Sequence, residues 1–119
     1  MTQEEKFLLL QDLCARLPYH TIVSTGEENL ELVKVDILNG LVYVFSESFL
    51  EFDAFEIKPY LRPMSSMTDA EKKELWELLK KLGMISDVKR LDWLLSKGFD
   101  VRNLIEKGLA LEAPKDMYK

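Results

Sequence analysis

The chain has 119 residues, a formal net charge of −5 and one cysteine, and its length matches a single domain. Because Cys14 has no partner for an internal disulfide, the composition excludes a disulfide-stabilised secreted scaffold and favours a reducing compartment. No stretch approaches the ~20 apolar residues of a membrane span, and the acidic N-terminus is unlike a signal peptide, so we expect a cytoplasmic protein.

The chain opens with a predicted amphipathic helix. Thr2 and Glu5 have the spacing of a capping box, which predicts a helix that begins at Gln3, and Pro18 ends it. A thiol on an apolar helix face usually packs as a small hydrophobe, so Cys14 is expected in the core. The predicted buried face is built by apolar residues at three- and four-residue spacing, namely Phe7, Leu10, Leu13, Cys14 and Leu17, with Leu9 beside them.

The next stretch predicts a small antiparallel sheet. Residues 19–25, His20 included, alternate in a β-branched run, and residues 30–37 and 41–45 predict two further strands. Val33, Val35 and Ile37 are expected on the buried face. Asn39-Gly40 predicts a hairpin with a type I′ turn between the second and third strands, because this pair tolerates two positive φ angles.

Residues 49–57 carry many aromatic side chains without a clean period, so a strand and a short helix both remain open here. The aromatic cluster of this region either fills a small core or presents a binding patch. With these residues the β-rich part forms a small curled antiparallel sheet, for which an SH3-like barrel is one form.

Residues 57–67, which we call the strap, join this part to a helical part. Pro59 and Pro63 fix φ and push their predecessors out of the α region, so the strap is expected to be extended. It is nevertheless apolar, which predicts that it packs where the two parts meet. The single domain 1–119 then consists of a β-rich half, 1–58, and a helical half, 68–113, on either side of the strap.

Three helices are predicted after the strap, which completes an α+β fold. Thr68 and Glu71 repeat the capping box. A lysine in the last turn and a glycine after it suit a helix end, because the cation meets the helix dipole and glycine adopts positive φ. The helices are expected to end at Gly83, Gly98 and Gly108, the second to start at Ser86 or Asp87 and the third at Asp100, and residues 109–111 are compatible with a short edge strand.

The charge is unevenly distributed along the chain. Residues 1–58 carry 11 acids and 4 bases, a net charge of −7, whereas residues 59–119 carry 10 acids and 12 bases, a net charge of +2. A polyanion would therefore prefer the second half, although the overall acidity opposes non-specific DNA binding. Two ordinary solvated surfaces explain the same numbers.

No constellation for catalysis or cofactor binding is found. Cys14 and His20 lie six residues apart, but nothing supplies an oxyanion hole, and one cysteine with one histidine cannot complete a structural zinc site. The chain has no P-loop and no glycine-rich dinucleotide turn. We therefore expect no enzyme, no catalytic residue, no cofactor and no metal.

Parts of the chain resemble a group of small uncharacterised proteins encoded in genomes of gut Bacteroidales and their mobile elements. The resemblance implies a bacterial intracellular setting and carries over no functional residue. It is carried by the strap from Ile57 to Met67, Trp93-Leu94, the run from Gly98 to Ala110 leading to Glu112-Ala113-Pro114, and the opening from Leu13 to Tyr19.

Two hypotheses of function remain. The first is a non-catalytic protein-interaction or accessory module of a bacterial cell or mobile element, and the alternative is a nucleic-acid-associated regulator. Candidate protein-binding residues are Phe49, Phe52, Phe55, Tyr60, Trp76 and Trp93. Candidate nucleic-acid-binding residues are Lys80, Lys81, Lys89, Arg90, Lys97 and Arg102.

Overall fold

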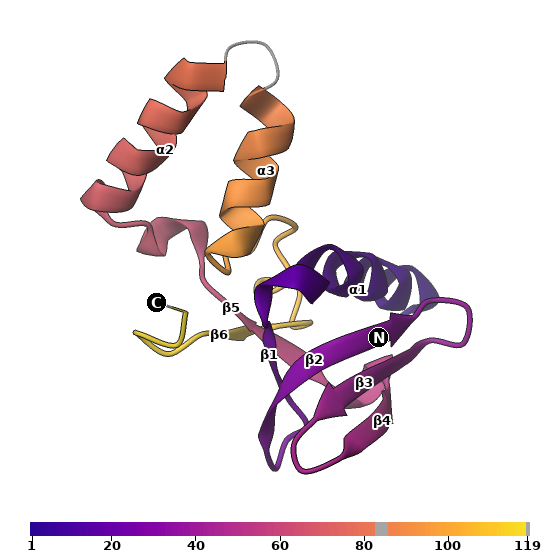
Figure 1. Cartoon of the computed structure of the whole chain (residues 1–119). Helices are drawn as coiled ribbons and strands as arrows, with labels where there is room; N and C mark the ends of the chain where they lie inside the picture. Colours follow the sequence, from indigo (N-terminus) through magenta and orange to yellow (C-terminus); the bar gives the residue numbers. More distant parts are fainter. Residues whose placement is uncertain (83–85, 119) are drawn as a thin grey trace.

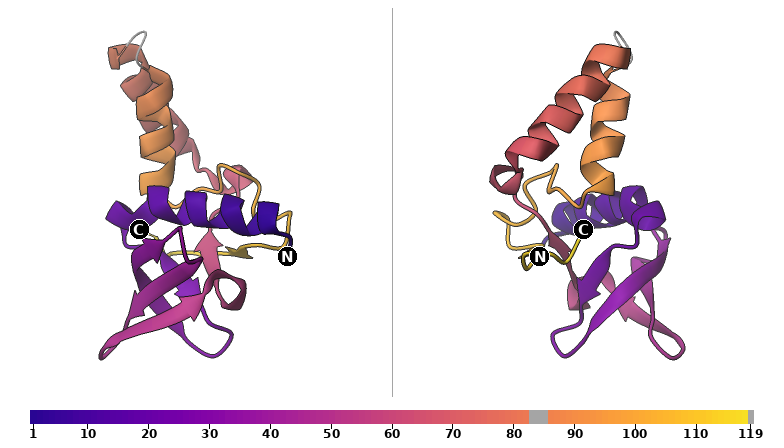
Figure 2. Two further views of the ribbon diagram at one scale, coloured as in Figure 1. Left: turned by 90° about the vertical axis from the view of Figure 1, so that its right-hand side faces the viewer. Right: turned by 60° about the vertical axis from the view of Figure 1, so that its left-hand side comes forward.

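The computed structural model describes residues 1–82 and 86–118. One helix, α1 (Gln3–Arg16), lies across a sheet, and two further helices, α2 (Asp69–Leu82) and α3 (Ser86–Ser96), form a hairpin that projects away from it (Figure 1). The same projection is evident from the sides (Figure 2). We call α1 with the sheet the body, and α2 with α3 the hairpin.

Six strands form one mixed sheet in the order β4-β3-β2-β1-β5-β6. All neighbours are antiparallel except β5 and β6, which run parallel. The α+β class is confirmed, whereas a closed barrel is not, because the sheet is open and β4 and β6 are its edges. The strands are β1 (Ile22–Ser24), β2 (Asn29–Asp36), β3 (Leu41–Phe45), β4 (Phe49–Asp53), β5 (Lys58–Leu61) and β6 (Leu111–Glu112).

The main core lies between α1 and the concave face of the sheet. Leu9, Leu10 and Leu13 of α1 are buried there, but Phe7, which the sequence placed on the same face, is 57% exposed. The buried face of α1 is rotated relative to the predicted one. It includes Asp12 and Arg16, which lie three residues after Leu9 and Leu13, respectively, and it leaves Phe7 outside. The capping box at Thr2 and Glu5 is confirmed.

The predicted hairpin of β2 and β3 is confirmed, but its turn type is wrong. Residues 37–40 connect the strands, and of the pair Asn39-Gly40 only Gly40 has a positive φ, 69°. A register shift between Leu32 and Lys34 interrupts the alternation, and Val33 is only half-buried, while Ile37 is exposed because it lies beyond the end of β2, in the connection to β3. His20 is also outside a strand, because it adopts φ 55° at the end of the 3₁₀ turn η1 (Leu17–Tyr19).

Residues 49–57, left open by the sequence, form β4 and then the 3₁₀ turn η2 (Ala54–Glu56). The strap is extended as predicted in its first part, where β5 pairs with β1 and β6, but not over residues 64–66, which form a 3₁₀ turn. Ile57 and Leu61 bury their side chains in the main core. A 3₁₀ turn, η3 (Met64–Ser66), then leads into α2.

The third predicted C-terminal helix is wrong, because residues 100–108 form turns. Asp100 does accept bonds from the amides of Leu104 and Ile105, but Asn103 has φ 57°, which interrupts a right-handed helix. The stop after α3 is confirmed by Gly98 at φ 83°, while the predicted stop at Gly83 lies outside the described residues. No helix among residues 1–82 and 86–118 is long and apolar enough to span a membrane.

Candidate interaction surface on the helical hairpin

The hairpin leaves and rejoins the body at one point. The amide of Arg62 donates to the carbonyl of Gly98 at 2.7 Å, and the amide of Asp100 donates to the carbonyl of Arg62 at 2.8 Å. Arg62 also forms a parallel bridge with Phe99. The two ends of the segment 63–97 are therefore held side by side by a short backbone ladder.

The Arg62 side chain fixes the start of α2 to this base. Both terminal nitrogens of its guanidinium donate to Glu71 at 2.7 Å, and the guanidinium carbon lies 4.1 Å from the centre of the Phe99 ring. Glu71 also completes the predicted capping box with Thr68. Hydrogen bonding from Arg62 is the main cause that lowers the pKa of Glu71 to about 2.

The hairpin has a small core of its own at its base. Trp93 stacks on Phe99 with ring centres 6.1 Å apart, and Leu94 is buried beside them. Leu75 and Leu78 of α2 pack against this cluster but remain partly exposed. None of the described side chains of α2 is fully buried, so the helix is only half covered.

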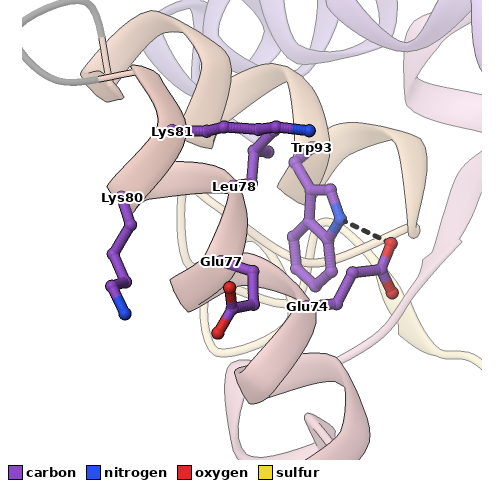
Figure 3. A pocket seen from close by; sticks show the side chains of 6 residues that line it. All are labelled: Glu74, Glu77, Leu78, Lys80, Lys81 and Trp93. Carbon is purple, nitrogen blue, oxygen red and sulfur yellow. Dashed lines mark hydrogen bonds between the residues drawn. The ribbon is translucent and has the colours of Figure 1, made fainter.

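A shallow cleft of about 490 Å³ opens between the two helices over Trp93. Figure 3 shows the indole between α2 and α3, with Glu74 at one end of the ring and Lys81 at the other. The indole N–H donates to Glu74 Oε1 at 3.2 Å. Two carboxylates and two ammonium groups line the cleft, so their formal charges cancel, and its lining residues are Glu74, Glu77, Leu78, Lys80, Lys81 and Trp93.

Large apolar side chains are exposed on the hairpin outside this cleft. Trp76 is 61% exposed and Val88 is 66% exposed. Trp76 and Leu78 are separated by about 160° around the helix axis, because successive residues are about 100° apart, so Trp76 points away from the cleft. A second groove, about 370 Å³, is formed at the base of α3 by Met64, Leu91, Leu94 and Val101, with Asp87, Arg90, Asp100 and Asn103 around it.

The six candidate protein-binding aromatics do not form one patch. Trp93 is buried, whereas Trp76 is exposed on the same hairpin. In the body, Phe49 is 71% exposed and its ring centre lies 5.1 Å from that of Phe45. Phe52 and Tyr60 are half-buried, and Phe55 is exposed beneath the Lys6 ammonium, 4.2 Å from its ring centre.

The candidate nucleic-acid residues are only partly available. Lys97 lies 3.7 Å from Glu74 Oε1, and Arg102 Nη1 donates to Asp12 Oδ1 at 2.7 Å, so both face a carboxylate. The other four, Lys80, Lys81, Lys89 and Arg90, are exposed on the hairpin, where Glu77, Asp87 and Asp92 are interspersed among them. The hairpin therefore presents mixed charge instead of a basic face.

A buried ionic cluster ties the hairpin base to α1, and sequence analysis missed it. Asp12 and Arg16 have no exposed surface, with Arg16 Nε 2.7 Å from Asp12 Oδ2. Arg16 Nη2 donates to the carbonyl of Phe99 at 2.7 Å, and Arg102 reaches Asp12 from the other side. The four-residue spacing of Asp12 and Arg16 was a visible signal of a pair, but not of its burial.

A second missed feature is an apolar surface at the turn between β2 and β3. Leu38 is 96% exposed there, and Phe7 and Ile37 are exposed beside a groove of about 270 Å³. An apolar residue inside a turn, as in Ile37-Leu38-Asn39-Gly40, was the available signal.

Candidate metal-binding and nucleophilic side chains are spread over the residues that the structure describes. No group of three or more histidine, cysteine, aspartate or glutamate side chains among them could hold a metal ion. Burial raises the pKa of the Cys14 thiol, which disfavours the reactive thiolate. His20 lies on the surface with Nδ1 3.1 Å from Glu31 Oε1.

Comparison with known proteins adds no relative to these observations. No protein-family model, no curated protein and no solved structure matches this chain. A function is therefore inferred from the geometry of the chain itself.

Proposed function

We propose that the chain is a non-catalytic protein-interaction or accessory module of a bacterial cell or mobile element, and that it binds its partner through the hairpin. The observation that carries the proposal is the exposure of Trp76 and Val88 on two helices that project from the body. Large exposed aromatic and aliphatic side chains of this kind are typical anchors of protein interfaces.

The way the hairpin is built supports this assignment. Its base is fixed by the Arg62–Glu71 pair and by Trp93 stacked on Phe99, so the helices are presented in a defined direction. Farther from the base, residues 87–92 of α3 are all exposed. A pre-ordered support with an uncovered surface lowers the entropy cost of binding.

The charge pattern favours a protein over a nucleic acid as the partner. Lys97 and Arg102 are neutralised by Glu74 and Asp12, and acidic side chains separate the remaining bases. Phosphate contacts require a clustered positive surface. We therefore retain nucleic-acid binding only as an outcome that the experiment below would reveal.

The strand order supports a further, purely structural part of the proposal. β5-β1-β2-β3-β4 form a curled, open sheet, and η2 lies between β4 and β5, an arrangement compatible with an SH3-like ancestry of the body. Fold analogy licenses no function. The hairpin and β6 are additions to such a sheet.

Site-specific photo-crosslinking in cells of the source bacterium tests the hairpin. A photoreactive phenylalanine analogue at position 76 should give one discrete crosslinked product, because this side chain is exposed and central to the proposed interface. An excess of the unlabelled chain should remove the product. An excess of the unlabelled chain that carries both Trp76→Ser and Val88→Ser should not compete.

Two results would contradict the proposal. One is competition by the double variant equal to that of the wild type. The other is duplex DNA binding that weakens steeply between ~50 and ~200 mM salt and disappears in Lys89→Glu with Arg90→Glu, which would establish the nucleic-acid alternative. Lys73→Ala, an exposed change on α2, is the matched control and should compete normally.

A further inference from the structure

One edge of the sheet, on the far side of the body from the hairpin, is a second candidate binding site (Figure 1). β4 is the terminal strand and pairs with β3 alone. Its other edge is free of backbone partners within the described residues. Exposed strand edges are templates for an added strand, and natural proteins usually cover or interrupt them.

The bonds at the two ends of the β3–β4 ladder show which backbone groups face outward. Ala54 donates to Gly40, and Ser46 donates to Ser48, so the even-numbered positions of β4 bond to β3. In an antiparallel pair the intervening residues direct their amide and carbonyl groups to the opposite side. Phe49 and Glu51 therefore present both groups at the open edge.

Side chains on both faces of β4 are incompletely covered. Phe49 lies opposite Phe45 on the outer face, and both are exposed. Leu50 lies opposite the fully buried Val44 and thus faces the core side, yet it is 37% exposed at the edge. An additional strand would cover Leu50 on one face and Phe49 on the other.

The charge of this edge discriminates between possible occupants. Neither Glu47 nor Glu51 forms an ion pair within the part of the chain that the structure describes. A second copy would pair antiparallel about a two-fold axis. Every register of that pairing centred on a residue from Phe49 to Phe52 sets two acids opposite each other. A two-fold axis at Phe49 pairs Glu47 with Glu51, and an axis at Leu50 pairs Glu47 with Asp53. An axis at Glu51 pairs this residue with its own copy, and an axis at Phe52 pairs Glu51 with Asp53.

We propose that the β4 edge binds, by strand addition, an extended segment of a partner protein that carries lysine or arginine on one face and apolar residues on the other. The basic side chains lie opposite Glu47 and Glu51, and the apolar side chains cover Leu50. The main chain of the segment bonds to Phe49 and Glu51. This site is independent of the hairpin and requires no part of it.

The test uses fluorescein-labelled peptides of about nine residues, the length of a typical strand, with the full chain and fluorescence anisotropy. A peptide of alternating valine and lysine should bind. The matched valine–glutamate peptide should bind at least about tenfold more weakly, because like charges directly opposite each other are destabilising. N-methylation of the alternate amides of the lysine peptide that face β4 should abolish binding, because strand addition needs those donors, whereas N-methylation of the other alternate set, which points away from β4, should leave binding intact.

Two variants of Glu51 locate the site. Glu51→Lys should reverse the preference between the two peptides. Glu51→Pro should remove binding of both and leave the fold intact by circular dichroism, because the outward amide it deletes does not bond to β3. Trp76→Ser should bind the peptides as the wild type does, which separates this site from the hairpin.

Three outcomes would overturn the proposal. Full binding of the peptide N-methylated at the amides that face β4 would show that the chain only attracts positive charge. Unchanged peptide preference in Glu51→Lys would place binding elsewhere. A dimer of the native chain that dissociates in Glu51→Pro would show that a second copy occupies the edge.

Discussion

The body and the hairpin differ in how completely they bury their apolar residues. In the body, Leu9, Leu13, Val42 and Val44 have no exposed surface. In the hairpin, α3 buries side chains only near its end, and no described side chain of α2 is fully buried. Isolated helices of this length are marginal in water, so the hairpin depends on the contacts at its base for its stability. The comparison indicates that the body carries most of the buried apolar surface, whereas the hairpin leaves much of its own uncovered.

The largest expected effect is at the junction of the two regions. Asp12→Ala should lower the free energy of unfolding by about 3–5 kcal/mol, because it leaves the buried Arg16 without its counter-charge. Arg16 Nη1 already lacks a hydrogen-bond partner in the described structure. Urea denaturation at pH 7 measures the effect. Asp92→Ala, at an exposed position of α3, is the control and should stay within about 0.5 kcal/mol of the wild type.

A smaller loss of stability, which depends on pH, is expected when the Arg62–Glu71 pair at the hairpin base is broken. Glu71 has a folded pKa of about 2 against an ordinary 4.5, so its stabilisation is complete above pH 4.5 and is lost as the pH falls toward 2. Glu71→Gln should therefore cost about 2 kcal/mol at pH 7, after discounting for partial exposure, and little near pH 2. Denaturation of both proteins across this range checks the sign. An equal loss of unfolding free energy at pH 7 and near pH 2 would refute the Arg62–Glu71 assignment.

Two turn glycines allow a finer comparison within the body. Gly40 and Gly26 both have positive φ, at which alanine costs about 1 kcal/mol or more. A Cβ at Gly40 would also lie 2.6 Å from Lys6 Cε, whereas nothing lies near one at Gly26. We expect Gly40→Ala to destabilise more than Gly26→Ala in thermal melts. Equal melting temperatures would mean that Lys6 moves aside freely.

The smallest expected effect is on the hairpin surface. Trp76→Ser should change the free energy of unfolding by no more than about 0.5 kcal/mol, because the side chain is largely exposed. Trp93→Ser is the matched change on α3 and should cost several times more, because Trp93 packs on Phe99. Chemical denaturation of both variants shows which tryptophan is structural. A large loss from Trp76→Ser would remove it from the proposed interface.

Local patterns predicted much of the fold, whereas contacts between distant residues account for the errors. The capping boxes at Thr2 and Thr68 were identified correctly because each lies within four residues. The buried face of α1 was misplaced because Arg16 is buried against Phe99, 83 positions away. The segment after Asp100 was read as a helix because Asp100 is a capping residue type and Lys107-Gly108 suits a helix end, whereas the positive φ of Asn103, which breaks the helix, has no such local signal.

The candidate surfaces were predicted by residue type but not by location. Trp76 and Trp93 were both candidate protein-binding residues because both are aromatic, but Trp93 is buried by its packing on Phe99 and Trp76 is exposed. The open edge at β4 depends on strand order, which the sequence did not determine. Arg102 looked available for phosphate because its partner, Asp12, is 90 positions away.

The short ladder between Arg62 and Gly98 has a consequence for how such a protein can diversify. Because residues 63–97 begin and end side by side, a change in the length of this segment away from its base would not shift the strand register of the body. The entropy cost of closing such an inserted segment rises only slowly with its length. Insertions and deletions within residues 63–97 are therefore expected to be tolerated better than insertions and deletions within the strands of the body.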